Sequence, residues 1–137
     1  MNAILLIAHA PLANALRQVA LHVLPETASA LAAVDVSAQD TPETAFAAVC
    51  AALDALHLRP SEHEGVLLLA DVPGATPCNV AQRVLATDGR VLRLLAGVNL
   101  PMLLRALCYR HEPLDSMAER ALEGGHRATL ALGANEE

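Results

Sequence analysis

Short apolar runs alternate along the chain with longer segments in which apolar residues recur every three or four positions. A run of about six apolar residues, rich in Leu, Ile and Val, is typical of a buried strand, whereas the longer period is typical of an amphipathic helix. The runs predict five strands: Ala3–Ala8, Leu31–Val36, Gly65–Ala70, Val91–Ala96 and Arg127–Leu132.

Prolines and capping residues indicate where the intervening helices begin. Proline is well tolerated in the first turn of a helix, and Thr or Asn at the N-cap accepts a hydrogen bond from a free N–H group. These signals predict helix starts at Pro11, Thr41-Pro42, Thr76-Pro77, Asn99 and Pro113. We expect the last helix to end at a C-cap formed by Gly124-Gly125.

Strands that alternate with helices indicate an α/β fold, because parallel strands need crossover connections that helices usually supply. Right-handed crossovers favour a doubly wound, mostly parallel five-stranded sheet with the order 2-1-3-4-5 and helices on both faces. We expect residues 1–137 to form one domain, since no linker or repeat divides them. In this order a crevice opens at the carboxyl ends of strands one and three, where ligands bind in such folds.

Charge and aromatic content exclude several classes of function. The chain of 137 residues has a formal net charge of −6, its nine basic residues are all arginines, and it contains one Phe and one Tyr. We therefore expect no nucleic-acid partner, because a basic surface and stacking aromatic residues are missing. The lack of lysine excludes Schiff-base chemistry, a P-loop and a response-regulator receiver.

Neither the cysteines nor the N-terminal segment indicates a metal site or export. Cys50, Cys78 and Cys108 show no C-x-x-C spacing, so we expect no disulfide framework and no bound metal. The first apolar run is much shorter than the roughly 20 residues that a membrane span needs, and no basic residue precedes it. We expect a cytoplasmic protein.

A histidine and a carboxylate follow the two strands that flank the expected crevice. His9 ends the first strand and Asp71 ends the third, so the two side chains are expected to face each other. The segment from Asp71 to Pro77 is a short turn that leads into a helix, and free N–H groups at such a turn bind anions. The candidate donors are the backbone N–H groups of Val72, Gly74, Ala75 and Thr76, and Thr76 also offers its hydroxyl as a helix cap or an anion ligand.

These residue types together point to phosphoryl transfer through a phosphohistidine. A neutral imidazole is nucleophilic, and the reference pKa of histidine near 6.5 leaves much of it neutral in a cytoplasm. Asp71 would fix the tautomer of His9 and aim its other ring nitrogen at phosphorus, while the turn holds the phosphoryl oxygens. This chemistry requires no cofactor. Asn99, which follows the fourth strand, is a possible lining residue of the same site.

Three stretches resemble the enzyme IIA components of the mannose family of the bacterial phosphoenolpyruvate-dependent sugar phosphotransferase system. They are Ile4–Ala13 (ILLIAHAPLA), Asp71–Asn79 (DVPGATPCN) and Gly97–Leu103 (GVNLPML), of which the last is the most specific. Their order and spacing agree with the family over essentially the whole chain. The resemblance implies that residues 1–137 are a single enzyme IIA domain of the mannose type.

The resemblance also implies a function for the site. His9 would be the phosphorylated residue, Asp71 its hydrogen-bond partner and Thr76 a hydroxyl that contacts the phosphoryl group. The protein would accept a phosphoryl group from the phosphocarrier HPr and pass it to a separate enzyme IIB for sugar uptake and phosphorylation. A homodimer, one antiparallel edge strand and an indirect link to the membrane through a permease complex are implied as well.

The chain departs from the usual family pattern next to the site. Ala10 stands where a glycine usually follows the histidine, Ala75 replaces the second glycine of a pair, and a bulky residue is common at the position of Pro73. Because alanine tolerates a positive φ poorly, we expect the turn after Asp71 to differ slightly from that of the family.

Other functions remain open at this point. Phosphorylation of His9 could signal metabolic state to a regulatory partner without sugar transport, or the chain could serve as phosphoryl donor to a dihydroxyacetone kinase. A flavodoxin-like flavin or nucleotide binder fits less well. Such a protein needs a Ser/Thr-rich loop after the first strand and aromatic residues beside the ring, but the chain has Ala10–Ala13 there and Phe46 within a helix.

Overall fold

Four of the five predicted apolar runs form the strands of one parallel sheet. The computed structural model describes residues 1–56 and 64–134. Its elements are β1 (Ala3–His9), α1 (Leu12–Val23), the 3₁₀ helix η1 (Pro25–Ala30), β2 (Leu31–Val36), α2 (Pro42–Ala55), β3 (Val66–Ala70), α3 (Thr76–Thr87), β4 (Leu92–Ala96), α4 (Leu100–Cys108) and α5 (Leu114–Arg127). The sheet order is β2-β1-β3-β4, so the α/β class and the first four positions of the predicted order are confirmed.

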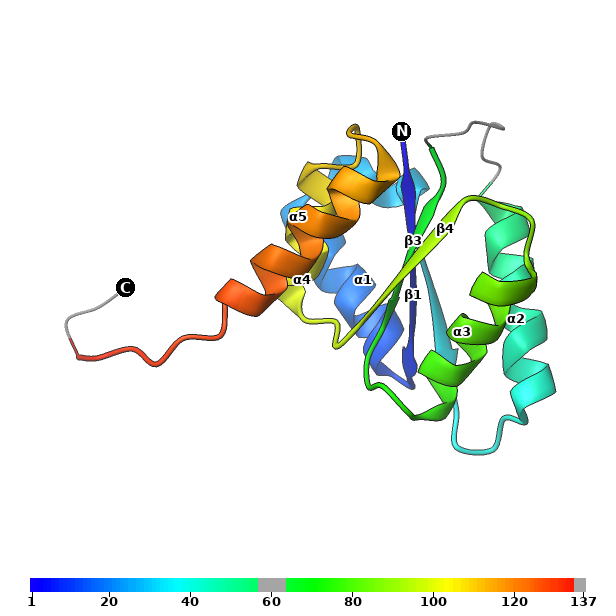
Figure 1. Ribbon diagram of the computed structural model, residues 1–137. Helices are drawn as coiled ribbons and strands as arrows, with labels where there is room; N and C mark the ends of the chain where they lie inside the picture. Colours follow the sequence, from blue (N-terminus) through cyan, green and yellow to red (C-terminus); the bar gives the residue numbers. More distant parts are fainter. Residues whose placement is uncertain (57–63, 135–137) are drawn as a thin grey trace.

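Helices cover both faces of the sheet, as predicted. Figure 1 shows α1, α4 and α5 on one face and α2 and α3 on the other. Alternate residues of β1 pack on opposite faces of the sheet. Ile4 and Leu6 pack in the core under α1, α4 and α5, whereas Leu5 and Ile7 pack in the core under α2 and α3. All four side chains are fully buried, and each such burial stabilises the fold by about 1.5–3 kcal/mol. None of the helices in the described ranges is long and apolar enough to cross a membrane.

The predicted fifth strand and antiparallel edge strand are wrong for this structure. Arg127 is the last residue of α5, and the described residues that follow it form no strand and lead away from the helical layers (Figure 1). Leu130 and Leu132 are 68% and 59% exposed. The alternation of this segment resembles a strand, but a strand also needs a sheet edge to pair with, and the segment pairs with none in the described parts of the chain.

The expected C-cap at Gly124-Gly125 is also wrong, because both glycines lie inside α5. They are buried against α4. A Cβ atom on Gly125 would lie 2.8 Å from Cβ of Met102, and one on Gly124 would lie 2.9 Å from Cγ of Arg105. The pair therefore allows close approach of two helices instead of ending one.

The helix starts agree with the capping signals in most cases. Thr41 is the N-cap of α2 and its Oγ1 accepts a hydrogen bond from the N–H of Thr44, while Asn99 is the N-cap of α4. At α3 the N-cap is Ala75, so Thr76 is the first helical residue and does not act as a cap. Pro113 precedes α5 as expected.

Candidate active site

His9 and Asp71 meet at the carboxyl ends of the two central strands. β1 ends with His9, and Asp71 directly follows β3, in which Ala70 lies opposite Ile7. The Asp71 side chain is only 8% exposed, whereas that of His9 is 55% exposed. A buried carboxylate thus holds an imidazole that remains accessible to a second molecule.

One oxygen of Asp71 makes two contacts with His9. Its Oδ2 accepts a hydrogen bond from the backbone N–H of His9 at 2.9 Å and lies 2.7 Å from Nδ1 of the ring. The other oxygen, Oδ1, accepts a hydrogen bond from the N–H of Val72 at 2.8 Å. Because an ionised carboxylate can only accept hydrogen bonds, Nδ1 must carry a proton. In the neutral imidazole the lone pair then lies on Nε2.

The same hydrogen bonds keep Asp71 ionised. Burial is the largest single influence on this carboxyl group, and it favours the protonated acid. The hydrogen bonds from the backbone and ring of His9 and from the N–H of Val72, together with the charge of His9, act in the opposite direction. The combined effect of these contacts exceeds that of burial, so the pKa of Asp71 is lower than its usual value.

The turn after Asp71 combines one left-handed residue with an extended one. Gly74 has a φ of +85°, which glycine adopts without a steric cost. Ala75 has φ −97° and ψ 168°, an extended conformation that any residue tolerates. The alanine that replaces a family glycine is therefore unstrained in this turn.

Two of the four predicted backbone donors are already engaged within the turn. The N–H of Val72 binds Asp71, and the N–H of Ala75 points to the carbonyl of Val72 at 3.5 Å. In the described residues the N–H groups of Gly74 and Thr76 have no partner, and the exposed hydroxyl of Thr76 caps nothing. Free N–H groups at a helix N-terminus favour negative charge, so the start of α3 can hold an anion beside His9.

Asn99 has a role in helix packing. Its Oδ1 accepts a hydrogen bond from the N–H of Met102 at 2.9 Å, and its Nδ2 donates to the carbonyl of Gly125 at 3.3 Å. It also lines a groove of about 530 Å³ between the end of β4, α4 and α5. This groove lies at the same edge of the sheet as His9, but no hydrogen bond joins Asn99 to His9 or Asp71.

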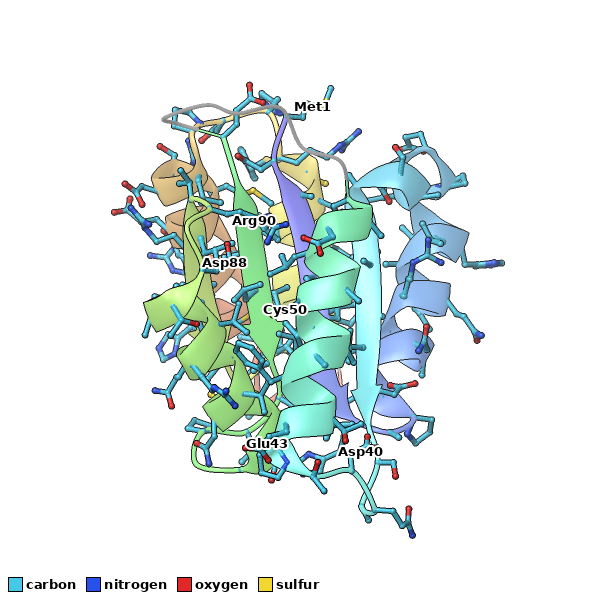
Figure 2. The ribbon with its side chains drawn as sticks, turned by 90° about the vertical axis from the view of Figure 1, so that its right-hand side faces the viewer. Met1, Asp40, Glu43, Cys50, Asp88 and Arg90 are labelled. Carbon is cyan, nitrogen blue, oxygen red and sulfur yellow. The ribbon has the colours of Figure 1, made fainter. Side chains whose placement is uncertain are left out.

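The end of the molecule that carries the site is rich in carboxylates. Figure 2 shows Asp40 and Glu43 at the end toward which β2 points, with Met1 at the opposite end. The nearby Arg83 lies 3.9 Å from a Glu43 oxygen and stacks on Phe46. Among the described residues no arginine pairs with Asp71. The groups of this turn that could bind an anion are therefore backbone N–H groups at the N-terminus of α3 and the Thr76 hydroxyl.

Asp35 and Asn14 form a contact near His9 that the pattern of the sequence does not predict. Asp35 lies in β2 and accepts hydrogen bonds from both the backbone N–H and the side-chain amide of Asn14, in the first turn of α1. One signal was available: Asp35 is the only charged residue in its predicted strand. Its partner could not be identified, because the two residues are 21 positions apart.

Comparison with known proteins gives a consistent match. A family model described as "PTS system fructose IIA component" matches residues 3–121. The chain is 51% identical over 51 residues to the PTS system fructose-specific EIIA component of Bacillus subtilis strain 168, covering 37% of the chain and 34% of that protein. It is 37% identical over 73 residues to the PTS system mannose-specific EIIAB component of Escherichia coli K12, covering 52% of the chain. The latter match spans only 22% of the Escherichia coli protein.

Solved structures share the fold over nearly the full chain. The mannose/sorbose specific IIA subunit of the phosphotransferase system from Enterococcus faecalis superposes with a TM-score of 0.84 at 28% identity, covering 99% of this chain and 98% of that one. The phosphotransferase system component EIIA from Streptococcus agalactiae gives a TM-score of 0.79 at 19% identity, covering 96% and 97%. The second similarity, at this low identity, shows the fold alone.

Proposed function

The chain belongs to the EIIA-man family of PTS IIA components, and on this premise we propose that it is a phosphocarrier whose phosphorylated residue is His9. The protein accepts a phosphoryl group from phospho-HPr and passes it to a separate enzyme IIB for sugar uptake and phosphorylation. It acts as a phosphotransferase with a phosphohistidine intermediate. It works in the cytoplasm as a homodimer, linked to the membrane only through a permease complex.

The observation that carries this proposal is the 2.7 Å contact between Nδ1 of His9 and Oδ2 of Asp71. It supports Nε2 as the nucleophile, because Nδ1 is protonated and bound. The Nε2 lone pair attacks phosphorus, the N–P bond of the donor phosphohistidine breaks, and the donor imidazole leaves with the electron pair. The proton on Nδ1 stays in its hydrogen bond to Asp71, whose negative charge stabilises the phosphorylated ring.

The turn after Asp71 supports the same step. The free N–H groups of Gly74 and Thr76 and the exposed Thr76 hydroxyl are available to bind phosphoryl oxygens, while Val72 and Ala75 hold the turn in shape. Phosphoryl transfer depends chiefly on positioning and charge stabilisation, and a preorganised set of N–H donors supplies both. The residues Asp71, Gly74, Ala75 and Thr76 thus serve one reaction at His9.

Incorporation of a single phosphoryl group tests the proposal. The protein is incubated with phosphoenolpyruvate, enzyme I and HPr, and its intact mass is measured. We expect one adduct that is lost in acid and survives alkali, because a phosphohistidine is a phosphoramidate. Acid lability distinguishes His9 from Thr76 as the acceptor, and stability in alkali distinguishes it from an acyl phosphate on Asp71.

Two matched histidine variants identify the acceptor. His9→Gln keeps the shape and a hydrogen-bonding group but removes the nucleophile, so it should give no adduct. His22→Gln changes an exposed histidine in the last turn of α1 and should be phosphorylated like the wild type. A folded wild-type protein that stays unmodified with phospho-HPr of its own organism contradicts the proposal. An adduct that no enzyme IIB of that organism discharges favours the regulatory alternative.

A further inference from the structure

Helix α1 begins directly after the His9 segment but has no capping side chain of its own. Its N-cap is Pro11, which has no side-chain acceptor. The N–H groups in the first turn of a helix have no partner within the helix, and a capping side chain usually supplies one. The helix that continues from His9 therefore needs an acceptor from elsewhere in the fold.

Asp35 supplies that acceptor from the neighbouring strand. Its Oδ1 lies 3.2 Å from the backbone N of Asn14, the third residue of α1, and its Oδ2 lies 2.8 Å from Nδ2 of the same residue. A carboxylate at this position caps the helix and interacts favourably with the positive end of its dipole. Both oxygens of Asp35 are used, and both contact Asn14.

The segment between β1 and α1 is consequently held by both strands that flank β1. On one side, Asp71 after β3 binds the backbone and ring of His9. On the other side, β2 binds the backbone N–H of Ala10 through the carbonyl of Val36 at 2.9 Å, and Asp35 binds Asn14. His9 is thus held directly by Asp71, and the chain that follows it is held at Ala10 and Asn14.

The location of Asp35 within a strand indicates that the contact compensates a cost. Asp35 pairs with Ala8 inside the parallel sheet, and it is half-buried. Aspartate is disfavoured in strands, and burial of a carboxylate costs free energy unless hydrogen bonds satisfy it. The other five residues of β2 are apolar, so a purely structural strand has no need of a carboxylate at this position.

We propose that Asp35 is a positioning residue for phosphoryl transfer at His9 and that it acts through Asn14 and the first turn of α1. The inference rests on the proposed function of His9 as phosphoryl acceptor. When Asp35 is removed, the first turn of α1 is released, and the imidazole is no longer confined to the orientation in which Nδ1 meets Asp71. Transfer slows because the reacting Nε2 is misplaced, while recognition of the donor is unchanged.

The first measurement follows the His9 ring itself by ¹⁵N NMR, which distinguishes protonated from unprotonated ring nitrogens. In the wild type we expect the tautomer protonated at Nδ1. In Asp35→Ala we expect a mixture of the two neutral tautomers, because the ring samples positions away from Asp71. Thr41→Ala is the matched control: it removes the side-chain cap of α2, a helix that does not continue from His9, and should leave the His9 spectrum unchanged.

The second measurement is the rate of phosphoryl transfer from phospho-HPr, determined well below the melting temperature of each variant. For Asp35→Ala we expect a rate at saturating donor about tenfold lower, with an unchanged KM, since small displacements of reacting groups reduce rates by up to about 10²-fold. Asp35→Asn should restore part of the rate, because its amide oxygen still accepts from the N–H of Asn14. Asn14→Ala keeps that backbone contact, so it should also reduce the transfer rate less than Asp35→Ala does.

The outcomes separate this inference from the proposed function. A wild-type protein that takes up no phosphoryl group overturns the function, whereas the NMR comparison still decides whether Asp35 positions His9. If Asp35→Ala keeps both the wild-type ring spectrum and the wild-type rate per folded molecule, the inference is wrong. It is also wrong if Asp35→Ala and Thr41→Ala slow transfer equally. If Asp35→Ala fails to fold, Asp35→Asn and Asn14→Ala are compared with Thr41→Ala in the same two measurements.

Discussion

Asp71 Oδ2 binds both the backbone N–H and the ring Nδ1 of His9, at 2.9 and 2.7 Å. The backbone contact fixes where the histidine lies, and the ring contact fixes how its imidazole is turned and which nitrogen carries the proton. This buried carboxylate therefore acts directly on the position, orientation and tautomer of an exposed side chain. These are the three properties that an imidazole needs to act as a nucleophile toward phosphorus.

The first prediction is that Asp71→Ala slows phosphorylation of His9 by roughly 10²-fold or more while the chain still folds. The variant removes the acceptor that orients the ring, and losses of positioning and tautomer control have effects of this size. The measurement is single-turnover transfer from phospho-HPr, with circular dichroism to confirm folding. The control is Asp115→Ala, which removes a carboxylate of α5 that pairs with Arg93 of β4. This variant should accept the phosphoryl group at the wild-type rate. If Asp71→Ala loses activity only in proportion to its unfolded fraction, Asp71 is a structural residue of the turn.

The second prediction concerns the acid stability of the fold. The pKa of Asp71 is lower in the folded protein than its usual value. A group with a lowered folded-state pKa stabilises the fold above its unfolded pKa, about 3.9, and this contribution is lost as the pH falls through the folded-state value. The free energy of unfolding of the wild type, minus that of Asp71→Asn, should therefore decrease between pH 6 and pH 3. Urea denaturation of both proteins across this range measures the difference in free energy of unfolding. If that difference does not change with pH, Asp71 does not titrate as inferred.

The sequence was most informative where one local signal determines the structure. The apolar runs predicted the four observed strands, and Thr41 and Asn99 predicted the starts of two helices, because burial of a strand and capping of a helix depend on neighbouring residues. The pairing of His9 with Asp71 could be predicted as well. His9 ends β1 and Asp71 directly follows β3, the two strands that flank a topological switch point, and in this fold that position alone brings them together.

The features that the sequence did not predict depend on a partner far along the chain. The Asn14–Asp35 contact joins residues 21 positions apart, so the charged residue in an otherwise apolar strand does not by itself identify its partner. Residues Arg127–Leu132 alternate like a strand but have no sheet edge to pair with in the described structure. The glycines at 124 and 125 resemble a helix end until α4 is known to pack against them.

The third prediction is that the protein is a homodimer in solution. β4 is an edge strand of the sheet, and Leu122, Leu130 and Leu132 are more than half exposed on and after α5. An unpaired edge and apolar side chains are features that oligomerisation commonly covers. Light scattering at micromolar concentration should give twice the 14.3 kDa of one chain. A monomeric mass over the whole concentration range would contradict the prediction.

The last prediction is that replacing Gly125 by alanine destabilises the fold, although the same change usually stabilises a helix. In an exposed helix Gly→Ala stabilises by about 1 kcal/mol, but Gly125 lies inside α5 against α4. An added Cβ would lie 2.8 Å from Cβ and 3.0 Å from Cε of Met102, and 3.3 Å from Oδ1 of Asn99. Gly125→Ala should therefore lower the free energy of unfolding by about 1–3 kcal/mol, as expected for overpacking. The control is Gly89→Ala, because Gly89 has no atom within 4 Å of the added Cβ and no left-handed φ, so its effect should stay within about 0.5 kcal/mol. Urea denaturation compares the two variants, and a Gly125→Ala protein at least as stable as the wild type would show that α4 and α5 are not packed as closely as described.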